Sequence, residues 1–266
     1  MENLTTLRTI FIGAGNLATR LSLALRQAGM PIVQVYSHTE THAIDLANQL
    51  ACAWTTCPEE IRADANLYFF SLKDDALPEV IAHIRPNDGL WVHTAGSLPM
   101  SLFVGHAKRY GVMYPLQTFS KGREVDFKRI PFFLEADSPT SGEILQTIAK
   151  ALSEDVRFLS SEQRKSLHLA AVFACNFTNH MYRLAGKILE KQGIPEEVLL
   201  PLIDETAAKV HSLSPAQAQT GPAVRYDKHV IDKHLAMLDD PSMRHIYEVI
   251  SQSIHKEIQQ NEQHSL

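Results

Sequence analysis

A glycine-rich turn near the N-terminus is the part of the sequence best suited to bind a ligand. Residues 9–18 read TIFIGAGNLA, a G-x-G-x-x-A pattern that directly follows an apolar segment. Gly13 permits a tight turn from a strand into a helix, and Gly15 lets a bound group approach the backbone because it has no Cβ. The N–H groups at the start of that helix would bind the pyrophosphate of a dinucleotide. The residues expected to do so are Gly13, Ala14, Gly15, Asn16 and Leu17.

The residues after the second expected strand bear on which dinucleotide binds. NAD sites usually carry an acidic residue there, which binds the ribose 2′-hydroxyl. Here the segment reads Ser37-His38-Thr39, and the nearest acid is Glu40. Ser37 and His38 could donate hydrogen bonds to a 2′-phosphate, although no arginine stands beside them. The sequence therefore favours NADP and leaves NAD open.

Three further loops follow expected strands at the same edge of the sheet as Gly13. Ligands of doubly wound sheets bind beyond the carboxyl ends of the strands, so these loops are candidates for the same site. Each could equally be an ordinary turn. The residues predicted to contact the cofactor are Ser71, Leu72, Lys73, Thr94 and Ala95, and Gln117 is predicted to face the substrate.

A long helical segment in the second half carries polar side chains at a regular spacing. His168, Asn176 and His180 occupy positions that are multiples of four apart, so in an α-helix they would share one face. Unpaired polar groups on a buried face cost about 1–3 kcal/mol each. One interpretation is catalytic, with His168 as a proton donor and Asn176 orienting the substrate or the nicotinamide carboxamide. The alternative is that these side chains bond to neighbouring backbone.

The segment TGPAVRYD at residues 220–227 is a second candidate for substrate binding. Thr220-Gly221-Pro222 predicts a rigid turn that exposes backbone N–H groups, and Arg225 could grip an anionic group with two hydrogen bonds. Thr220, Gly221 and Arg225 are therefore predicted substrate residues. The alternative for Arg225 is a surface ion pair with Asp227, which would contribute little.

The order of elements predicts two domains. Residues 1–160 alternate short apolar strands with amphipathic helices, which indicates an α/β Rossmann domain with a doubly wound, mostly parallel sheet. Residues 161–266 show only helical periodicity and predict an all-α domain for substrate binding and dimerisation. The expected strands are 9–12, 32–36, 67–72, 90–93, 110–114, 131–135 and 156–159, and the expected helices are 17–28, 41–50, 77–84, 99–104, 141–153, 161–192, 195–213, 214–220, 226–238 and 241 onward.

Composition argues against several other classes of protein. Thirty acidic and 25 basic residues give a net charge of −5, and the basic residues form no cluster of the kind that binds nucleic acid. No apolar run reaches the length of roughly 18–20 residues that a membrane span needs. The three cysteines show neither metal-ligand spacing nor a disulfide framework, so no metal site is expected. These features favour a reduced, cytoplasmic protein.

The ordered motifs FIGAGNLA, HTAG, YPLQTF, HLAAVFACNF and TGPAVRYD resemble a bacterial group of Rossmann-like NADP oxidoreductases whose C-terminal helical domain has no defined function. This group is distantly similar to pyrroline-5-carboxylate reductase and 6-phosphogluconate dehydrogenase. The resemblance implies a helical domain that forms a homodimer and closes the active site. Related hydroxyacid dehydrogenases carry a lysine four residues before the helical asparagine, but Val172 stands there in this chain.

Together these observations predict an oxidoreductase that transfers a hydride between NADP(H) and a small carbonyl, imine or alcohol. His168, Asn176 and Gln117 are the candidate catalytic residues. The alternative is a protein that senses or regulates by binding a dinucleotide without turnover. The identity of the substrate does not follow from the sequence.

Overall fold

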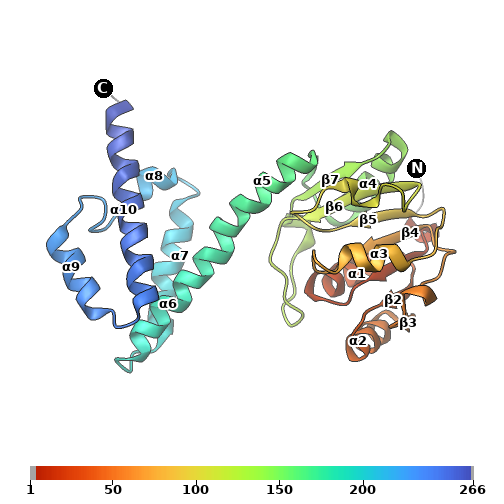
Figure 1. The fold of residues 1–266 in the computed structure, drawn as a ribbon, viewed down its shortest axis with the longest axis horizontal. Coiled ribbons are helices and arrows are strands. Elements are labelled where there is room, and N and C mark those ends of the chain that lie inside the picture. Colours follow the sequence, from red (N-terminus) through yellow and green to blue (C-terminus); the bar gives the residue numbers. More distant parts are fainter. Residues whose placement is uncertain (1–3, 265–266) are drawn as a thin grey trace. The chain divides into compact units, whose positions relative to one another are not determined.

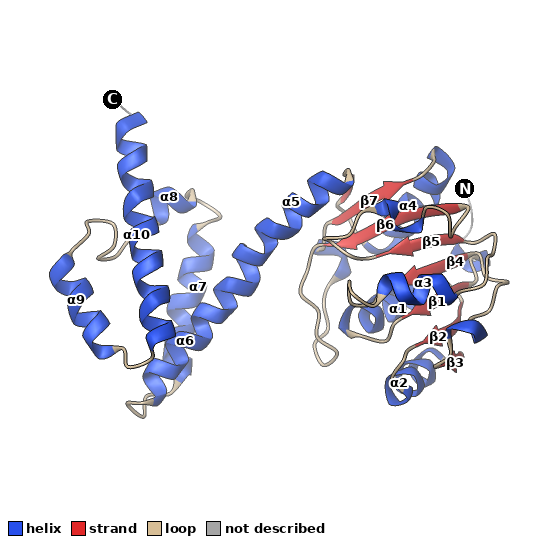
Figure 2. Cartoon of the chain, in the orientation of Figure 1, coloured by secondary structure: helices blue, strands red, loops and turns tan. Residues whose placement is uncertain are grey.

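The computed structural model describes residues 4–264. The chain forms two compact units, Met1–Asn176 and Phe177–Leu266, and each is described separately below (Figure 1). The first unit contains a sheet flanked by helices, and the second is made of helices (Figure 2).

The sheet of the first unit has eight strands in the order β3-β2-β1-β4-β5-β6-β7-β8. Neighbouring strands are parallel except for the antiparallel pair β6 and β7. The strands are β1 (Thr9–Ile12), β2 (Ile32–Tyr36), β3 (Ala53–Thr55), β4 (Leu67–Phe70), β5 (Leu90–His93), β6 (Arg109–Pro115), β7 (Phe132–Ala136) and β8 (Val156–Phe158). The order 3-2-1-4-5-6 is that of a dinucleotide-binding Rossmann fold, so the predicted fold class is confirmed.

Central strands with two apolar faces build a core on each side of the sheet. Along β4, Leu67 and Phe69 join one cluster of buried side chains, whereas Tyr68 and Phe70 join the other. Successive side chains of a strand point to opposite faces, so continuous apolar strands indicate a sheet that is covered on both sides. The covering helices are α1 (Asn16–Gln27), α2 (Glu40–Leu50), α3 (Leu77–His83) and α4 (Pro139–Leu152), with short 3₁₀ turns at Leu4–Thr6, Pro58–Glu60, Met100–Phe103 and Phe127–Arg129.

Two expectations for this unit need correction. The strand β3 at the sheet edge was not predicted, because Ala53 and Trp54 are exposed and three residues show no alternation of apolar and polar side chains. The helix expected at 99–104 is only a 3₁₀ turn at Met100–Phe103, in which Phe103 alone is buried.

The long helix predicted at 161–192 is interrupted. It begins as α5 (Ser161–Ala171), continues as a π-helical segment at Val172–Phe177 and resumes as α6 (Thr178–Glu190). A π-helical turn holds more residues than an α-helical turn. The rotation between His168, Asn176 and His180 therefore differs from that in a continuous α-helix, and their shared face stays a prediction.

The second unit contains α6, the 3₁₀ turn Glu196–Leu199, α7 (Leu200–Lys209), α8 (Pro215–Ala218), α9 (Lys228–Met237) and α10 (Pro241–His264). Its helices are joined by few polar contacts, such as the ion pair of Lys191 with Asp239 at 2.9 Å and the hydrogen bond between His234 Nδ1 and the Tyr247 hydroxyl at 2.8 Å. The part of the chain that the structure describes contains no helix long and apolar enough to cross a membrane.

Candidate functional site

The glycine turn after β1 is built so that only glycine fits at its first position. Gly13 has φ of +120°, and a Cβ added there would lie 2.2 Å from the carbonyl oxygen of Ser71. The backbone N–H of Gly13 donates to the carbonyl of Tyr36 at 2.8 Å, and the N–H of Ser71 donates to Ile12 at 2.8 Å. The turn is therefore clamped between the carboxyl ends of β2 and β4 with no room for a side chain.

The next residues leave an open helix terminus. Gly15 is the N-cap of α1, and no side chain caps this end of the helix. A Cβ built on Gly15 would meet nothing within 4 Å, so the space above the helix terminus is open. Uncapped N–H groups and the positive end of the helix dipole together attract an anion such as a pyrophosphate. The binding of a pyrophosphate by Gly13, Ala14, Gly15, Asn16 and Leu17 stays a prediction, and the open helix terminus is compatible with it.

The residues after β2 form a small polar turn before α2. Ser37 is 4% exposed, and its hydroxyl accepts a hydrogen bond from the N–H of Thr39 at 3.3 Å. The exposed His38 has its Nε2 3.1 Å from the hydroxyl of Thr39. The helix α2 also begins without a side-chain cap. His38 and this helix terminus are accessible to a phosphate, whereas Ser37 is mostly enclosed.

Hydroxyl groups connect the loops after β4 and β5. The Thr94 hydroxyl donates to that of Ser71 at 3.2 Å, and the N–H of Ala95 donates to Nδ1 of His93 at 3.2 Å. Leu72 is partly buried and Lys73 is exposed. The predicted cofactor residues Ser71, Leu72, Lys73, Thr94 and Ala95 therefore lie on two neighbouring loops at the carboxyl edge of the sheet.

Gln117 follows β6 on an exposed loop. Its side-chain oxygen accepts from the N–H of Thr118 at 2.9 Å, so the amide is partly engaged in a local turn. Ser120 and Lys121 lie farther along this loop. Their carbonyl oxygens accept hydrogen bonds from Arg20 of α1. The loop is thereby tied to the helix whose N-terminus forms the anion cradle.

His168 lies against the sheet from the first helix after β8. Its Nδ1 is 3.0 Å from the hydroxyl of Tyr114, which comes from the end of β6, and the two rings meet edge to face. A Cβ on Gly96 would lie 2.6 Å from Nδ1 of His168. His168 therefore packs directly on the loop after β5, two residues beyond the predicted cofactor residue Thr94.

A buried ion pair fixes α5 in this position. Arg164 is 1% exposed and donates to the carboxylate of Glu135 on β7 and to the carbonyl of Leu98. The hydroxyl of Ser161 donates to both carboxylate oxygens of Glu135 at 2.8 and 3.0 Å, and it accepts from the N–H of Met100 at 3.0 Å. With its charge and lone pairs satisfied in this way, Glu135 joins the helix to the sheet.

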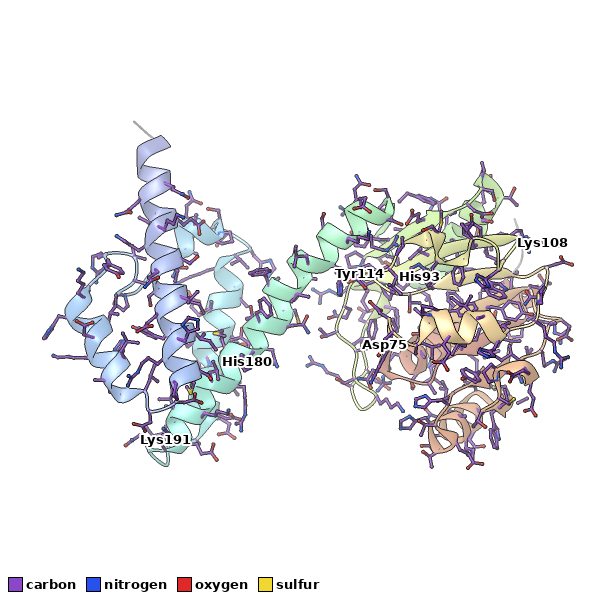
Figure 3. All side chains as sticks on the ribbon, in the orientation of Figure 1. Asp75, His93, Lys108, Tyr114, His180 and Lys191 are labelled. Atoms are coloured by element: carbon purple, nitrogen blue, oxygen red, sulfur yellow. The ribbon has the colours of Figure 1, made fainter. Side chains whose placement is uncertain are left out.

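His93 at the end of β5 is fully buried beneath the site. Burial, reinforced by the nearby Arg164, lowers the pKa of His93 to about 3, so the ring is neutral at physiological pH. Its Nδ1 accepts a hydrogen bond and its buried Nε2 finds no partner within residues 4–264. Figure 3 shows His93 and Tyr114 near one another in the first unit.

The structure brings some predicted residues together and leaves others apart. The glycine turn, Ser71 and Thr94 lie on adjoining loops of the first unit, and His168 on α5 contacts one of these loops at Gly96. Asn176 is eight residues beyond His168, which is about 12 Å along a helix at 1.5 Å per residue. Thr220, Gly221 and Arg225 belong to the second unit, where Gly221 has φ of +105° and Arg225 is exposed. Their role in binding substrate stays a prediction.

Sequence reasoning missed Tyr114, Arg164 and Glu135 as parts of this region. Tyr114 was noted at the end of a strand and in the YPLQTF motif, but a partner 54 residues away leaves no local trace. A signal did exist for Arg164, since a charged residue in a helix turn that is otherwise expected to pack on a sheet requires a buried partner. Among the described residues, no group of His, Cys, Asp and Glu side chains could hold a metal ion.

Comparison with known proteins identifies both parts of the chain. Residues 8–93 match the family described as NADP oxidoreductase, coenzyme F420-dependent, and residues 130–254 match a domain family of unknown function, DUF2520. No curated protein sequence matches the chain. The resemblance to Rossmann-like NADP oxidoreductases with a C-terminal domain of undefined function is confirmed.

Solved structures match nearly the whole chain. A Bacteroides fragilis protein provisionally named an NADP oxidoreductase is 54% identical, with a TM-score of 0.90 over 96% of this chain and 100% of that one. A reductive aminase from Aspergillus terreus in complex with NADPH and ethyl levulinate is 14% identical, with a TM-score of 0.71 over 94% of each chain. A pyrroline carboxylate reductase from Plasmodium falciparum with NADP bound is 11% identical, with a TM-score of 0.59 over 96% of this chain and 98% of that one. The last two likenesses show the fold alone.

Proposed function

We propose that this protein, which belongs to the same NADP oxidoreductase family as the Bacteroides fragilis protein, transfers a hydride between NADP(H) and a small carbonyl, imine or alcohol. The observation that carries the proposal is the convergence of three features at one sheet edge. These are the uncapped terminus of α1, the linked hydroxyls of Ser71 and Thr94, and the imidazole of His168 on Gly96. An anion cradle beside a proton-transferring group suits reduction by a dinucleotide.

NADP is the cofactor of this proposal. The prediction of NADP agrees with the family name and with the NADP bound by the Plasmodium falciparum reductase. Here the pyrophosphate would lie at the turn Gly13–Leu17, and the 2′-phosphate at His38, with Ser37 beneath it. Leu72, Lys73 and Ala95 would line the path toward the nicotinamide. When bound, NADPH supplies the hydride.

His168 is the proposed proton donor, because its imidazole is not fully buried and contacts Gly96 in the loop after β5. Gln117 and Asn176 are proposed to orient the substrate, and Thr220, Gly221 and Arg225 to bind it. Each of these assignments can be tested by replacing one side chain. The proposed substrates are ketones, aldehydes and imines, since their reduction needs one hydride and one proton.

The proposal is tested by cofactor binding and then by turnover. We expect 1 mM NADPH to raise the melting temperature by several degrees and NADH to raise it less. Turnover is then followed as loss of NADPH absorbance with ethyl levulinate, alone and with methylamine, and with 1-pyrroline-5-carboxylate. Failure of both dinucleotides to stabilise the protein would contradict the proposal. Binding without turnover of any carbonyl or imine tested would favour a sensing or regulatory role.

The helical unit is proposed to form a homodimer in the cytoplasm. Its surface carries large exposed side chains, including Leu202 at 62% and Met237 at 73% exposure. An apolar groove of about 420 Å³ between α6, α9 and α10 is lined by residues such as Ile188 and Ile250. An apolar groove beside exposed apolar side chains is a feature of protein–protein interfaces. Light scattering should give twice the chain mass of 29.8 kDa.

A further inference from the structure

The hydrogen bond between Tyr114 and His168 has a direction that the surrounding groups determine. Burial raises the pKa of the Tyr114 hydroxyl above its ordinary value of 10.0, an effect that Arg164 opposes only in part. The hydroxyl therefore keeps its proton at physiological pH and needs an acceptor. The acceptor that the structure provides is Nδ1 of His168 at 3.0 Å. In a neutral imidazole the other nitrogen, Nε2, then carries the hydrogen.

This arrangement poses a problem for His168 as a lone proton donor. A neutral imidazole cannot release its Nε2 proton without a proton arriving at Nδ1, because the product would be an imidazolate. An isolated histidine can serve as an acid only while it is charged, and that charge is lost as the pH rises through about 6.5. The Tyr114 hydroxyl can supply a proton to Nδ1, so a neutral His168 can then also act as an acid.

We propose that Tyr114 and His168 act as a two-residue proton relay, in which Tyr114 supplies a proton to Nδ1 of His168 while the proton on Nε2 passes to the substrate. The inference rests on the proposed reduction and assigns Tyr114 a role behind His168. Tyr114 does not touch the substrate, so it is a positioning and proton-supplying residue.

The relay conserves atoms and charge. The Nε2–H bond of His168 breaks, and its proton joins the oxygen or nitrogen of the substrate, whose carbon receives the hydride. The O–H bond of Tyr114 breaks in the same step, and its proton joins Nδ1. The imidazole is neutral before and after the step, and the electron pair of the O–H bond stays on Tyr114 as a phenolate. The phenolate then takes the proton back from Nδ1 while water supplies a proton to Nε2, which restores the starting tautomer.

Burial disfavours that phenolate, and the charge of Arg164 offsets part of this effect. On α5, Arg164 is buried one helical turn before His168, and its Nε has no hydrogen-bond partner within the described part of the chain. On β7, Glu135 is held by Arg164 and by Ser161. On β5, His93 is neutral because burial lowers its pKa to about 3. The positive charge nearest to Tyr114 is thus Arg164.

Packing fixes the orientation of the His168 ring. The loop after β5 has Gly96 where His168 crosses it, and any side chain at Gly96 would collide with Nδ1 and Cβ of His168. With Nδ1 engaged by Tyr114, Nε2 is the nitrogen that can reach a ligand. Gly96 and Tyr114 thereby fix the position of the ring and its tautomer.

The first experiment measures the tautomer of His168 and requires no turnover. Histidines are labelled with ¹⁵N, and the His168 signals are assigned by their loss in His168→Gln. We expect the neutral ring to carry its hydrogen on Nε2 in the wild type and to become a mixture of both tautomers in Tyr114→Phe. Tyr110→Phe, which removes a hydroxyl from the same strand, should leave the spectrum of His168 unchanged. An unchanged tautomer in Tyr114→Phe, or an equal change in Tyr110→Phe, would overturn the relay.

The second experiment measures the pH profile of turnover with NADPH and the carbonyl or imine substrate that the protein reduces. Wild-type kcat should stay high to above pH 10, because burial raises the pKa of Tyr114 above its ordinary value. In Tyr114→Phe the alkaline limb should move to lower pH, which gives a loss of about 100-fold at pH 8.5 and little loss at pH 5.5. The KM for NADPH should not change. Active Tyr114→Phe with an unshifted limb contradicts the relay alone, whereas failure to bind NADPH contradicts the proposed function and the relay with it.

Discussion

The two units differ in how completely they bury their own apolar side chains. In the first unit, large side chains such as Phe11, Phe69 and Trp91 are fully enclosed between sheet and helices. In the second unit, Ala223 and Ile231 are the apolar residues that the structure describes as buried, while Leu200, Leu202 and Met237 are more than half exposed. The first unit therefore has a core of its own, whereas the second leaves much of its apolar surface exposed. Four experiments test this difference between the two units.

Removal of the buried charge that joins α5 to the sheet should have the largest effect. Arg164→Met leaves the carboxylate of Glu135 without its cation in the interior, which should destabilise the protein by about 3 kcal/mol in urea unfolding. Arg157→Met is the matched control, because Arg157 pairs with Asp155 on the surface and should contribute no measurable stability. Equal effects of the two substitutions would mean that α5 is not held by this pair.

Filling the glycine turn should abolish cofactor binding while the second unit is unaffected. In Gly13→Val the new side chain would collide with the carbonyl of Ser71 and adopt an unfavourable φ. We expect NADPH affinity to fall at least about 100-fold, equivalent to about 3 kcal/mol, in calorimetric titration. Gly122→Ala is the control, since a Cβ there meets nothing within 4 Å. Unchanged oligomeric mass in both variants would show that the defect is confined to the first unit.

Acid should weaken the first unit through His93. Its pKa is about 3 in the folded chain and about 6.5 when exposed, so between these values the unfolded chain binds more protons. Stability should therefore be fully present above pH 6.5 and decline as the pH falls, by about 2 kcal/mol at pH 5. Urea unfolding at pH 7 and pH 5 measures the decline. His93→Gln should flatten it, and an equal decline in that variant would assign it to other groups.

A charge in the groove of the second unit should have the smallest effect. Ile188→Glu places a carboxylate among the apolar residues of the groove, and sedimentation should show a dimer weakened by about tenfold. Val104→Glu, at an exposed position of the first unit, is the control and should leave the mass unchanged. A response of both variants would contradict the assignment of association to the helical unit.

The sequence predicted the framework better than the contacts within it. The strands at 9–12, 32–36 and 90–93 were predicted with their observed bounds, because apolar segments between turn residues are a local signal. The pairing of His168 with Tyr114 was not predicted, since it depends on how a helix after the sheet packs on a strand 54 residues earlier. The π-helical turn at Val172–Phe177 was not predicted either, because side-chain periodicity gives no sign of it.

The π-helical segment also constrains how the gene can change. A single residue inserted into or deleted from an α-helix turns everything beyond it by about 100°. Homologues that keep both ends of the helix in register should therefore preserve the length of the chain between His168 and His180, even where the residues differ. The exposed loop after β6, which is tied down through backbone carbonyls, should instead accept insertions and deletions. An alignment of distant relatives would thus have its gaps in the loop and none in the helix.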